Sequence, residues 1–178
     1  RDLRVFRPHQ LSDEAEKLLH EKEVTGRSAW NRLFDETIAT MKVTVPLPTG
    51  AESLTVSDAL NRLSDGDRAV REAAAKGVSA AFAEKGRLFT LITNTLAKDK
   101  AIVDNWRRYP RPASARNRAN MVEDEVVEAL VSAVRASFPR LSHRYYAMKA
   151  KWLGLEKLQH WDRNAPLPDQ DDSLIPWP

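Results

Sequence analysis

Apolar residues recur every three or four positions along most of the chain, the spacing of one face of an α-helix. The pattern begins after Ser12, where Asp13 and Glu16 have the spacing of a capping box. Thr25-Gly26 interrupts it. It then resumes with Trp30, Leu33, Phe34, Ile38 and Met41. We therefore expect two consecutive helices in this part of the chain.

The spacing of apolar residues changes from helical to alternating after Met41. Met41-Lys-Val-Thr-Val-Pro-Leu47 alternates apolar and polar side chains, and Leu54-Thr-Val56 comes after the turn-forming Pro48-Thr-Gly50. This alternation predicts one small β-hairpin near residues 42–56. Pro46 cannot donate a hydrogen bond to a sheet ladder, so we expect the hairpin to be edge-like.

A long helical tract comes next. Ser57 is placed to cap a short helix, and Asp65-Gly-Asp67 predicts a turn whose last residue caps the following helix. The apolar repeat then continues to Trp106. Because such a run exceeds the usual length of a globular helix, we expect a break near Gly86.

A proline-rich segment divides the second half. Residues 107–114 must leave the helix, because their two prolines remove backbone donors and disfavour helical geometry before them. Amphipathic helices are expected over 122–138 and 139–153, and Gly154 is placed to end the second. The remaining tail has four prolines and is typical of an extended linker. The predicted fold class is all-α, mostly helical apart from the hairpin.

Composition places the chain among soluble globular proteins. It is 42% apolar, its net charge is +3, and it has no cysteine, which excludes disulfides and a thiol nucleophile. No apolar run approaches the roughly 20 residues that cross a bilayer, and Arg1-Asp2-Leu3-Arg4 is unlike a signal peptide. We expect a cytoplasmic protein with no membrane partner. The missing initiator Met suggests a piece of something longer.

Catalytic motifs are absent. In His20-Glu21-Lys22-Glu23-Val24, valine stands where the second histidine of a zinc-binding H-E-x-x-H motif should be. The other histidines, His9, His143 and His160, share no helix-face spacing. We therefore expect no catalytic residue and no metal site in this chain.

A basic and aromatic segment carries the one signal typical of nucleic-acid binding. Its residues are Trp106, Arg107, Arg108, Tyr109, Arg111, Arg116 and Arg118. Arginines contact phosphates and aromatic rings stack on bases. The nearby carboxylates Asp99, Asp104 and residues 123–125 oppose a polyanion, so nucleic acid is not the expected partner.

Several strings resemble a known family. His143-Arg-Tyr-Tyr-Ala-Met-Lys149 leads through Trp152-Leu-Gly-Leu155 into His160-Trp-Asp-Arg-Asn-Ala-Pro166. Leu91-Ile-Thr-Asn-Thr-Leu-Ala-Lys-Asp-Lys100 precedes Trp106-Arg-Arg-Tyr-Pro110. These strings resemble enzymes of the oligoendopeptidase F family, which is related to thimet oligopeptidase. The resemblance covers residues 12–178.

The resemblance implies a helical peptidase body whose channel admits short peptides and whose Zn²⁺ is held by residues that cannot be placed on this chain. The chain would then be an inactive fragment of a zinc metallopeptidase. Segment 1–106 would be an N-terminal oligopeptidase F-like segment, and 107–178 the start of the peptidase domain. The fragment would form a non-catalytic wall of the channel against the remainder of that domain.

Within that wall, Arg108, Tyr109 and His160 are the candidate substrate-binding residues, with packing between helices as the other interpretation. The alternative function is a free-standing helical interaction or nucleic-acid-binding module. A fragment should leave an apolar helix face uncovered when alone, whereas a free-standing module should not.

Overall fold

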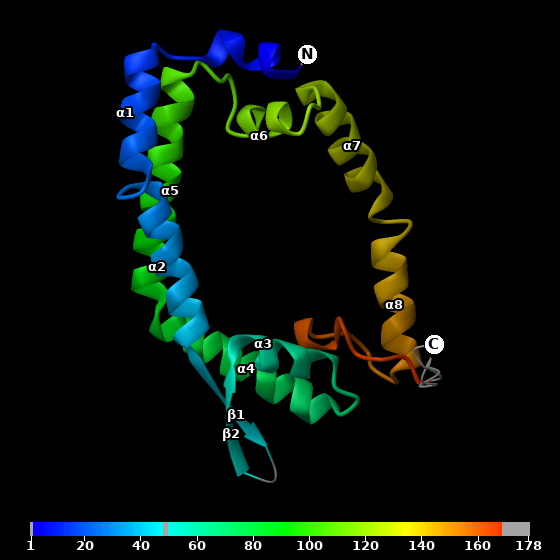
Figure 1. Cartoon of the computed structure of the whole chain (residues 1–178). Helices are drawn as coiled ribbons and strands as arrows, with labels where there is room; N and C mark the ends of the chain where they lie inside the picture. Colours follow the sequence, from blue (N-terminus) through cyan, green and yellow to red (C-terminus); the bar gives the residue numbers. More distant parts are fainter. Residues whose placement is uncertain (1, 48–49, 169–178) are drawn as a thin grey trace, which may run out of the picture. The chain divides into compact units, whose positions relative to one another are not determined.

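The computed structural model describes residues 2–47 and 50–168, and most of them are helical, which confirms the predicted fold class (Figure 1). The chain forms two compact units. The first comprises Arg1–Ile38 and Lys85–Ala136, and the second comprises Ala39–Glu84 and Ser137–Pro178. This division into compact units does not test the predicted segments 1–106 and 107–178, which stay a prediction. Most of the predicted linker, from residue 169 on, lies outside the described residues.

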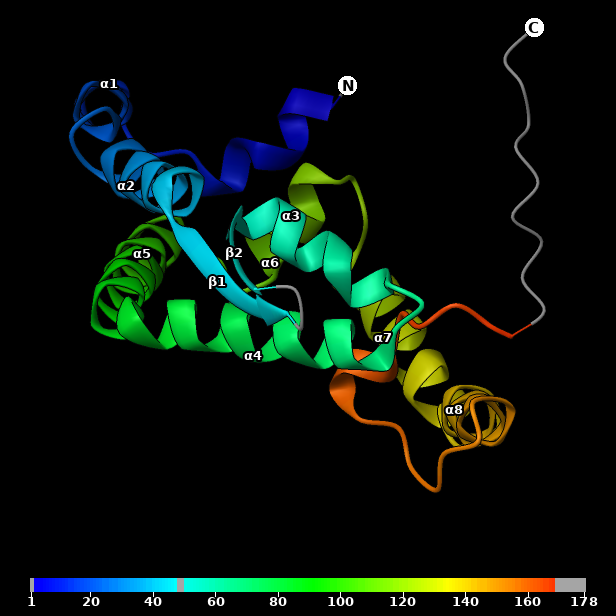
Figure 2. The same cartoon turned by 90° about the horizontal axis from the view of Figure 1, so that it is seen from below.

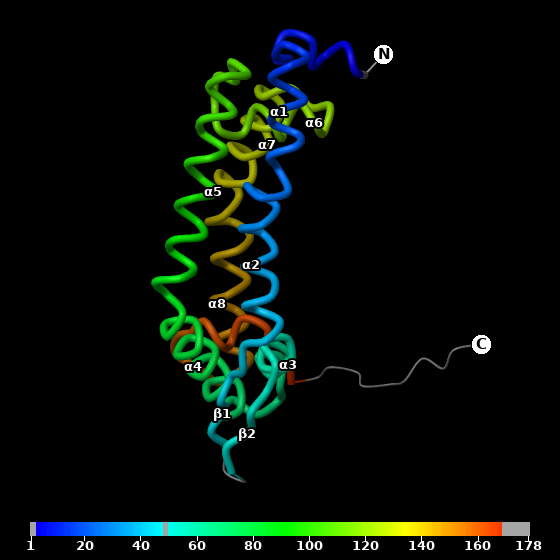
Figure 3. The backbone as a smooth tube through the Cα atoms, turned by 60° about the vertical axis from the view of Figure 1, so that its left-hand side comes forward, coloured from blue at the N-terminus to red at the C-terminus, as the bar shows by residue number. Residues whose placement is uncertain are grey.

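The first unit is built along helix α5 (Gly86–Trp106). Helices α1 (Asp13–Glu23) and α2 (Arg27–Thr40) follow one another beside it, with the predicted interruption at Thr25-Gly26 between them (Figures 1 and 3). Phe34 of α2 meets Phe89 of α5 edge-on, with ring centroids 5.5 Å apart. The unit also contains η1 (a 3-10 helix, Asp2–His9), α6 (Ser114–Ala119) and α7 (Asp124–Ser137).

In the second unit, helix α4 (Arg68–Glu84) covers one face of the predicted hairpin (Figure 2). Strands β1 (Lys42–Leu47) and β2 (Gly50–Thr55) pair antiparallel, in a register from Lys42 opposite Thr55 to Leu47 opposite Gly50. Alternation along β1 buries Val43 and Val45 completely. The other elements are α3 (Val56–Asn61), η2 (Arg62–Ser64), α8 (Ser142–Trp152) and η3 (His160–Asp162).

Three predicted helix boundaries are confirmed. Asp67 Oδ1 accepts a hydrogen bond from the Ala69 N–H at 2.8 Å, directly before α4. Helix α4 ends at Glu84 and α5 begins at Gly86, which is the predicted break. Gly154 follows α8 with a φ of 67°, a conformation that favours glycine at a helix C-terminus.

The predicted capping box of α1 is wrong. Ser12 is the capping residue, because its backbone is extended and its Oγ accepts from the Ala15 N–H at 3.3 Å. Asp13 is already the first helical residue. Glu16 instead accepts a hydrogen bond from the Leu11 N–H at 3.1 Å, so its carboxylate acts outside the helix.

Two other helices begin at residues different from those predicted. Thr55, not Ser57, caps α3, since its extended backbone lets its Oγ1 accept from the Asp58 N–H at 3.1 Å. The helix predicted over 139–153 begins only at Ser142. The reason is that Leu141 N–H donates back to the Ser137 carbonyl oxygen at 2.9 Å, so the intervening residues close the end of α7.

Candidate functional site

The chain leaves α5 through the arginine-tyrosine segment that the sequence singles out. Arg107 closes the helix, and its N–H donates to the Val103 carbonyl oxygen at 2.9 Å. Arg108 then takes a φ of 58°, in the left-handed region that non-glycine residues seldom adopt. Arg108 is exposed, whereas Tyr109 is half-buried. The two candidate residues therefore have different surroundings, and Arg108 is the one whose side chain is open to solvent.

Arg107 ties the end of α5 to α1. Its Nη1 and Nη2 donate to the two carboxylate oxygens of Glu16, each at 2.7 Å, and Nη1 also donates to the His9 carbonyl oxygen at 3.3 Å. The hydrogen bonds from Arg107 lower the pKa of Glu16 to about 2, and the same contact raises the pKa of Arg107. Arg107 is thus committed to holding the N-terminal segment.

His9 explains the surroundings of Tyr109. The two rings stack with centroids 4.1 Å apart and planes 16° apart. His9 Nδ1 lies 2.7 Å from the Arg107 carbonyl oxygen, which can only accept, so Nδ1 carries the proton. His9 is also buried. These contacts give both rings a packing role at the end of α5.

We expect Glu16→Gln to lower the free energy of unfolding by about 1 kcal/mol at pH 7, the upper end for a partly exposed ion pair. Because the folded-state pKa of about 2 lies below the ordinary 4.5, this contribution is present above pH 4.5 and is lost as the pH falls toward 2. Urea denaturation at pH 7 and at low pH measures both effects. Glu21→Gln is the control, since Glu21 meets Lys17 at 3.9 Å on an exposed face. Equal losses in the two variants would contradict the assigned role.

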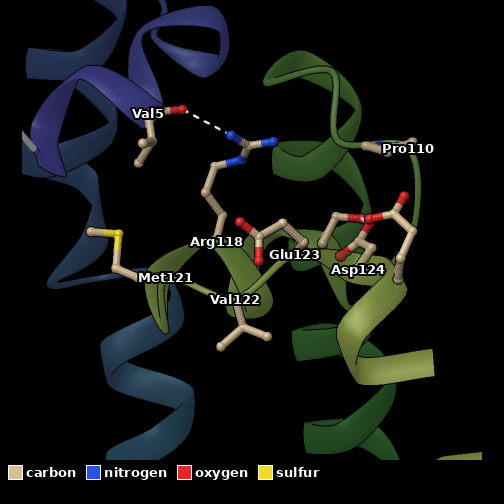
Figure 4. Close-up of a pocket in the computed structure, with 9 residues that line it drawn as sticks. Val5, Pro110, Arg118, Met121, Val122, Glu123 and Asp124 are labelled. Atoms are coloured by element: carbon tan, nitrogen blue, oxygen red, sulfur yellow. Dashed lines mark hydrogen bonds between the residues drawn. The ribbon is translucent and has the colours of Figure 1, made fainter. Parts of the chain in front are cut away.

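A pocket of about 410 Å³ lies beside α6 and the start of α7 (Figure 4). Val5, Pro110, Met121 and Val122 contribute apolar surface to it. Arg118 Nη1 crosses to donate to the Val5 carbonyl oxygen at 3.1 Å, the dashed line in Figure 4. This bond joins η1 to α6, so the pocket is bounded by segments far apart in the sequence.

Asp124, on the same pocket, is held as a carboxylate. It accepts hydrogen bonds from Ser114 Oγ at 2.6 Å and Asn117 Nδ2 at 2.8 Å, and Arg111 Nη2 lies 3.0 Å away. Led by the Ser114 and Asn117 bonds, these contacts lower the pKa of Asp124 to about 2. Asp124 therefore remains ionised near neutral pH, and its bonds fix α6 to α7 instead of moving protons.

In the second unit, a buried carboxylate fixes the segment after α8. Asp162 is completely buried and accepts from Arg68 Nε at 3.0 Å and from Arg71 Nη2 at 3.1 Å, both on α4. Burial alone raises the pKa of Asp162, but the hydrogen bonds from Arg68, the Gln159 N–H and Arg71 outweigh it, so the pKa is lowered. Arg71 also donates to the Trp161 carbonyl oxygen at 3.2 Å. Two arginines of α4 thus hold η3 in place.

His160, the third candidate, lies in this unit on the solvent side of η3. It is exposed, and its ring meets the Trp161 ring edge-on at 4.7 Å. Both residues line a pocket of about 720 Å³ beside α8. The structure therefore places Arg108 and Tyr109 in the first unit and His160 in the second. A substrate-binding role for the three stays a prediction.

The described residues do not fit a zinc ion. Within 2–47 and 50–168 no group of three or more His, Cys, Asp or Glu side chains is arranged to hold a metal. No helix in this part of the chain is both long and apolar enough to cross a membrane.

Comparison with known proteins finds similarity to one family. A sequence profile described as Oligopeptidase F matches residues 1–42. The fold matches the crystal structure of oligoendopeptidase-F from Enterococcus faecium with a TM-score of 0.83 and 27% identity, over 94% of this chain. Together these matches support a fragment of the oligoendopeptidase F family. This assignment confirms the resemblance found in the sequence.

The curated relatives are much longer than the chain. It is 25% identical to Group B oligopeptidase PepB of Streptococcus agalactiae serotype III (strain NEM316) over 94% of its own length, and 29% identical to Oligopeptidase PepF of Bacillus subtilis (strain 168) over 90%. It spans only 28% and 24% of those two proteins, and 32% of the Enterococcus faecium chain. The matched region is thus about a quarter to a third of each of these proteins.

Sequence reasoning missed the residues that hold each unit together. The local spacing predicts a helix cap for Glu16, and no pattern in the sequence singles out Arg68 or Arg71. Asp162 lay inside the family-like string without an assigned partner. Its signal was a lone carboxylate between a tryptophan and an arginine, and its partners on α4 are about ninety positions earlier in the sequence.

Proposed function

We propose that this chain is a non-catalytic part of a zinc-dependent oligoendopeptidase and forms a wall of the channel that receives short peptides. The observation that carries the proposal is the match to the Enterococcus faecium oligoendopeptidase-F over 94% of the chain. Because the chain spans about a third of that protein, the residues that bind zinc and cleave the peptide would lie in the remaining polypeptide. There the zinc ion would supply an activated water.

Uncovered apolar helix faces support a larger body. On α7, Val126, Leu130, Val131 and Val134 are 54%, 63%, 49% and 46% exposed. On α8, Tyr145, Met148 and Trp152 are 44%, 39% and 46% exposed. Contiguous exposed apolar side chains are unusual on a self-sufficient domain and mark surfaces that other protein covers. We assign both faces to contacts with the remainder of the peptidase domain.

The contribution of this chain to catalysis would be binding and orientation. Arg108 is exposed at a sharp turn, and its guanidinium has the donors to hold a peptide carboxylate or carbonyl oxygen. Tyr109 and His160 are proposed as further contacts on the same ground of residue type. In this scheme no residue of the chain takes or gives a proton during cleavage.

The test is a peptidase assay on the polypeptide encoded by the whole reading frame, beside this chain alone. We expect the longer polypeptide to contain an H-E-x-x-H motif and to cleave a quenched fluorescent peptide. A chelator should abolish the activity and added Zn²⁺ should restore it, while the chain alone should bind no stoichiometric zinc and cleave nothing. Chelator-resistant cleavage, or a reading frame without the motif, would overturn the proposal.

In the longer enzyme, we expect Arg108→Ala to lower kcat/KM by roughly tenfold to a hundredfold with zinc content and melting temperature unchanged, as for the loss of one charge-assisted hydrogen bond of roughly 1.5–3 kcal/mol. Steady-state kinetics measure kcat/KM, and thermal denaturation measures the melting temperature. Arg87→Ala, an exposed arginine at the other end of α5, is the matched control. If Arg108→Ala reduces stability and leaves the kinetics of the folded enzyme normal, Arg108 is a structural residue.

A further inference from the structure

The pocket beside α8 has the size and the walls of a ligand site. Its volume of about 720 Å³ falls within the roughly 300–1,000 Å³ usual for small-molecule sites. Tyr146, Ala147 and Ala150 of α8 form one apolar side, and Leu63 and Leu158 add to it. These residues all belong to the second unit. A side chain of moderate size can lose its contact with water there.

The charges around this pocket are of one sign. Lys157 and Arg163 line it, and no aspartate or glutamate does. Neither the Lys157 ammonium nor the Arg163 guanidinium forms an ion pair within the part of the chain that the structure describes. The neighbouring Asp162 is already bound by Arg68 and Arg71. Two cations on a pocket wall without a carboxylate favour an anionic ligand.

A buried donor without an acceptor belongs to a residue that lines this pocket. Trp161 lines the pocket, and its Nε1–H is buried with no hydrogen-bond partner among the described residues. An indole N–H can only donate, and a buried donor left unpaired is unfavourable. The apolar wall and the two cations together favour an apolar group joined to an oxygen anion.

We propose that this pocket binds the C-terminal residue of a short peptide, with its apolar side chain against α8 and its free carboxylate facing Lys157 and Arg163. The choice of a peptide over other apolar carboxylates rests on the proposed function. Binding itself belongs to the second unit, is separate from the Arg108 region, and requires no zinc.

The experiment titrates this chain with N-acetyl-Ala-Ala-Phe carrying a free carboxylate and with the same peptide as its amide. Calorimetry gives the affinity, and the indole N–H signal of ¹⁵N-labelled protein, assigned with Trp161→Phe, reports contact at the pocket. We expect the acid to bind about tenfold more tightly than the amide, the size expected for one charge-assisted hydrogen bond. The Trp161 signal should shift with the acid, and added salt should weaken binding.

Lys157 and Arg163 are exposed, so substitutions of their side chains should leave the fold intact. Lys157→Gln and Arg163→Gln should each weaken binding of the acid severalfold and leave binding of the amide unchanged. The Arg163 backbone oxygen, which accepts from Lys149 Nζ at 2.8 Å, is untouched by its substitution. Lys151→Gln is the matched control, because Lys151 is exposed on α8 and does not line the pocket.

Three results would overturn the proposal: equal affinity for acid and amide, an unshifted Trp161 indole signal, or an equal loss in Lys151→Gln. Binding to this chain but not to the longer polypeptide would also overturn it, since another segment would then cover the pocket. Failure of the proposed function looks different. In that case the chelator-sensitive cleavage is missing, while the difference between acid and amide on this chain remains measurable.

Discussion

Replacing Asp162 by alanine is expected to lower the free energy of unfolding of the second unit by about 3–5 kcal/mol. The substitution leaves Arg71, only 3% exposed, with a buried charge that its remaining carbonyl partners do not neutralise. It also frees η3 from α4. For a chain of this size the loss corresponds to a fall of about 6–20 °C in melting temperature, measurable by circular dichroism.

Glu72→Gln is the control that removes an exposed ion pair instead of a buried one. Glu72 accepts from Lys76 Nζ at 2.6 Å on the same helix, but the Lys76 side chain is 66% exposed. Exposed pairs one helical turn apart contribute about 0.3–0.5 kcal/mol. The control should therefore melt within about 2 °C of the parent. Similar melting temperatures for Asp162→Ala and Glu72→Gln would show that the buried network does not stabilise the unit.

The lowered pKa of Asp162 gives this prediction a pH dependence. Its folded-state pKa lies below the ordinary 3.8, so its contribution is present above pH 3.8 and is lost as the pH falls through the folded-state value. The stability difference between the parent and Asp162→Asn should therefore be constant between neutral pH and about pH 5 and should shrink in stronger acid. Denaturant titrations of both proteins across this range provide the measurement.

Local signals predicted the helices, the hairpin and several of their ends. Gly154 ends α8 because glycine adopts a positive φ at little cost, and this requirement is visible in the sequence alone. The same holds for the alternation in β1 that buries Val43 and Val45. The family could be found as well, because its strings are contiguous and keep their order.

Contacts between distant residues were not predictable. The stack of His9 on Tyr109 and the hydrogen bond from Arg71 to Asp162 join residues about a hundred and about ninety positions apart, and no periodic pattern couples them. The assignment of Glu16 failed for the same reason, since its local spacing fits a capping box while Arg107 competes for its carboxylate from another helix. Of the predicted site residues, Tyr109 stacks on His9, whereas the Arg108 side chain is exposed to solvent.

The contact between α4 and β1 depends on Gly77, a glycine inside α4. A Cβ atom on Gly77 would lie 2.5 Å from the Thr44 carbonyl oxygen and 3.3 Å from Val43 Cγ1. The first distance is shorter than any van der Waals contact, and the obstructing atom belongs to the backbone of β1. A side chain at position 77 must therefore push the hairpin away from the helix.

We expect Gly77→Val to destabilise the second unit by about 3 kcal/mol, the upper end of the usual range for overpacking. Valine and glycine differ by less than about 0.5 kcal/mol in helix propensity, so the loss reports the clash and not the helix. Gly86→Val is the matched control, because no atom lies within 4 Å of a Cβ built at Gly86. Denaturant midpoints should separate the two variants, with Gly86→Val close to the parent and Gly77→Val well below it. Were the two midpoints equal, the hairpin would not be seated on α4 through Gly77, and the register that buries Val43 against that helix would need to be reassigned.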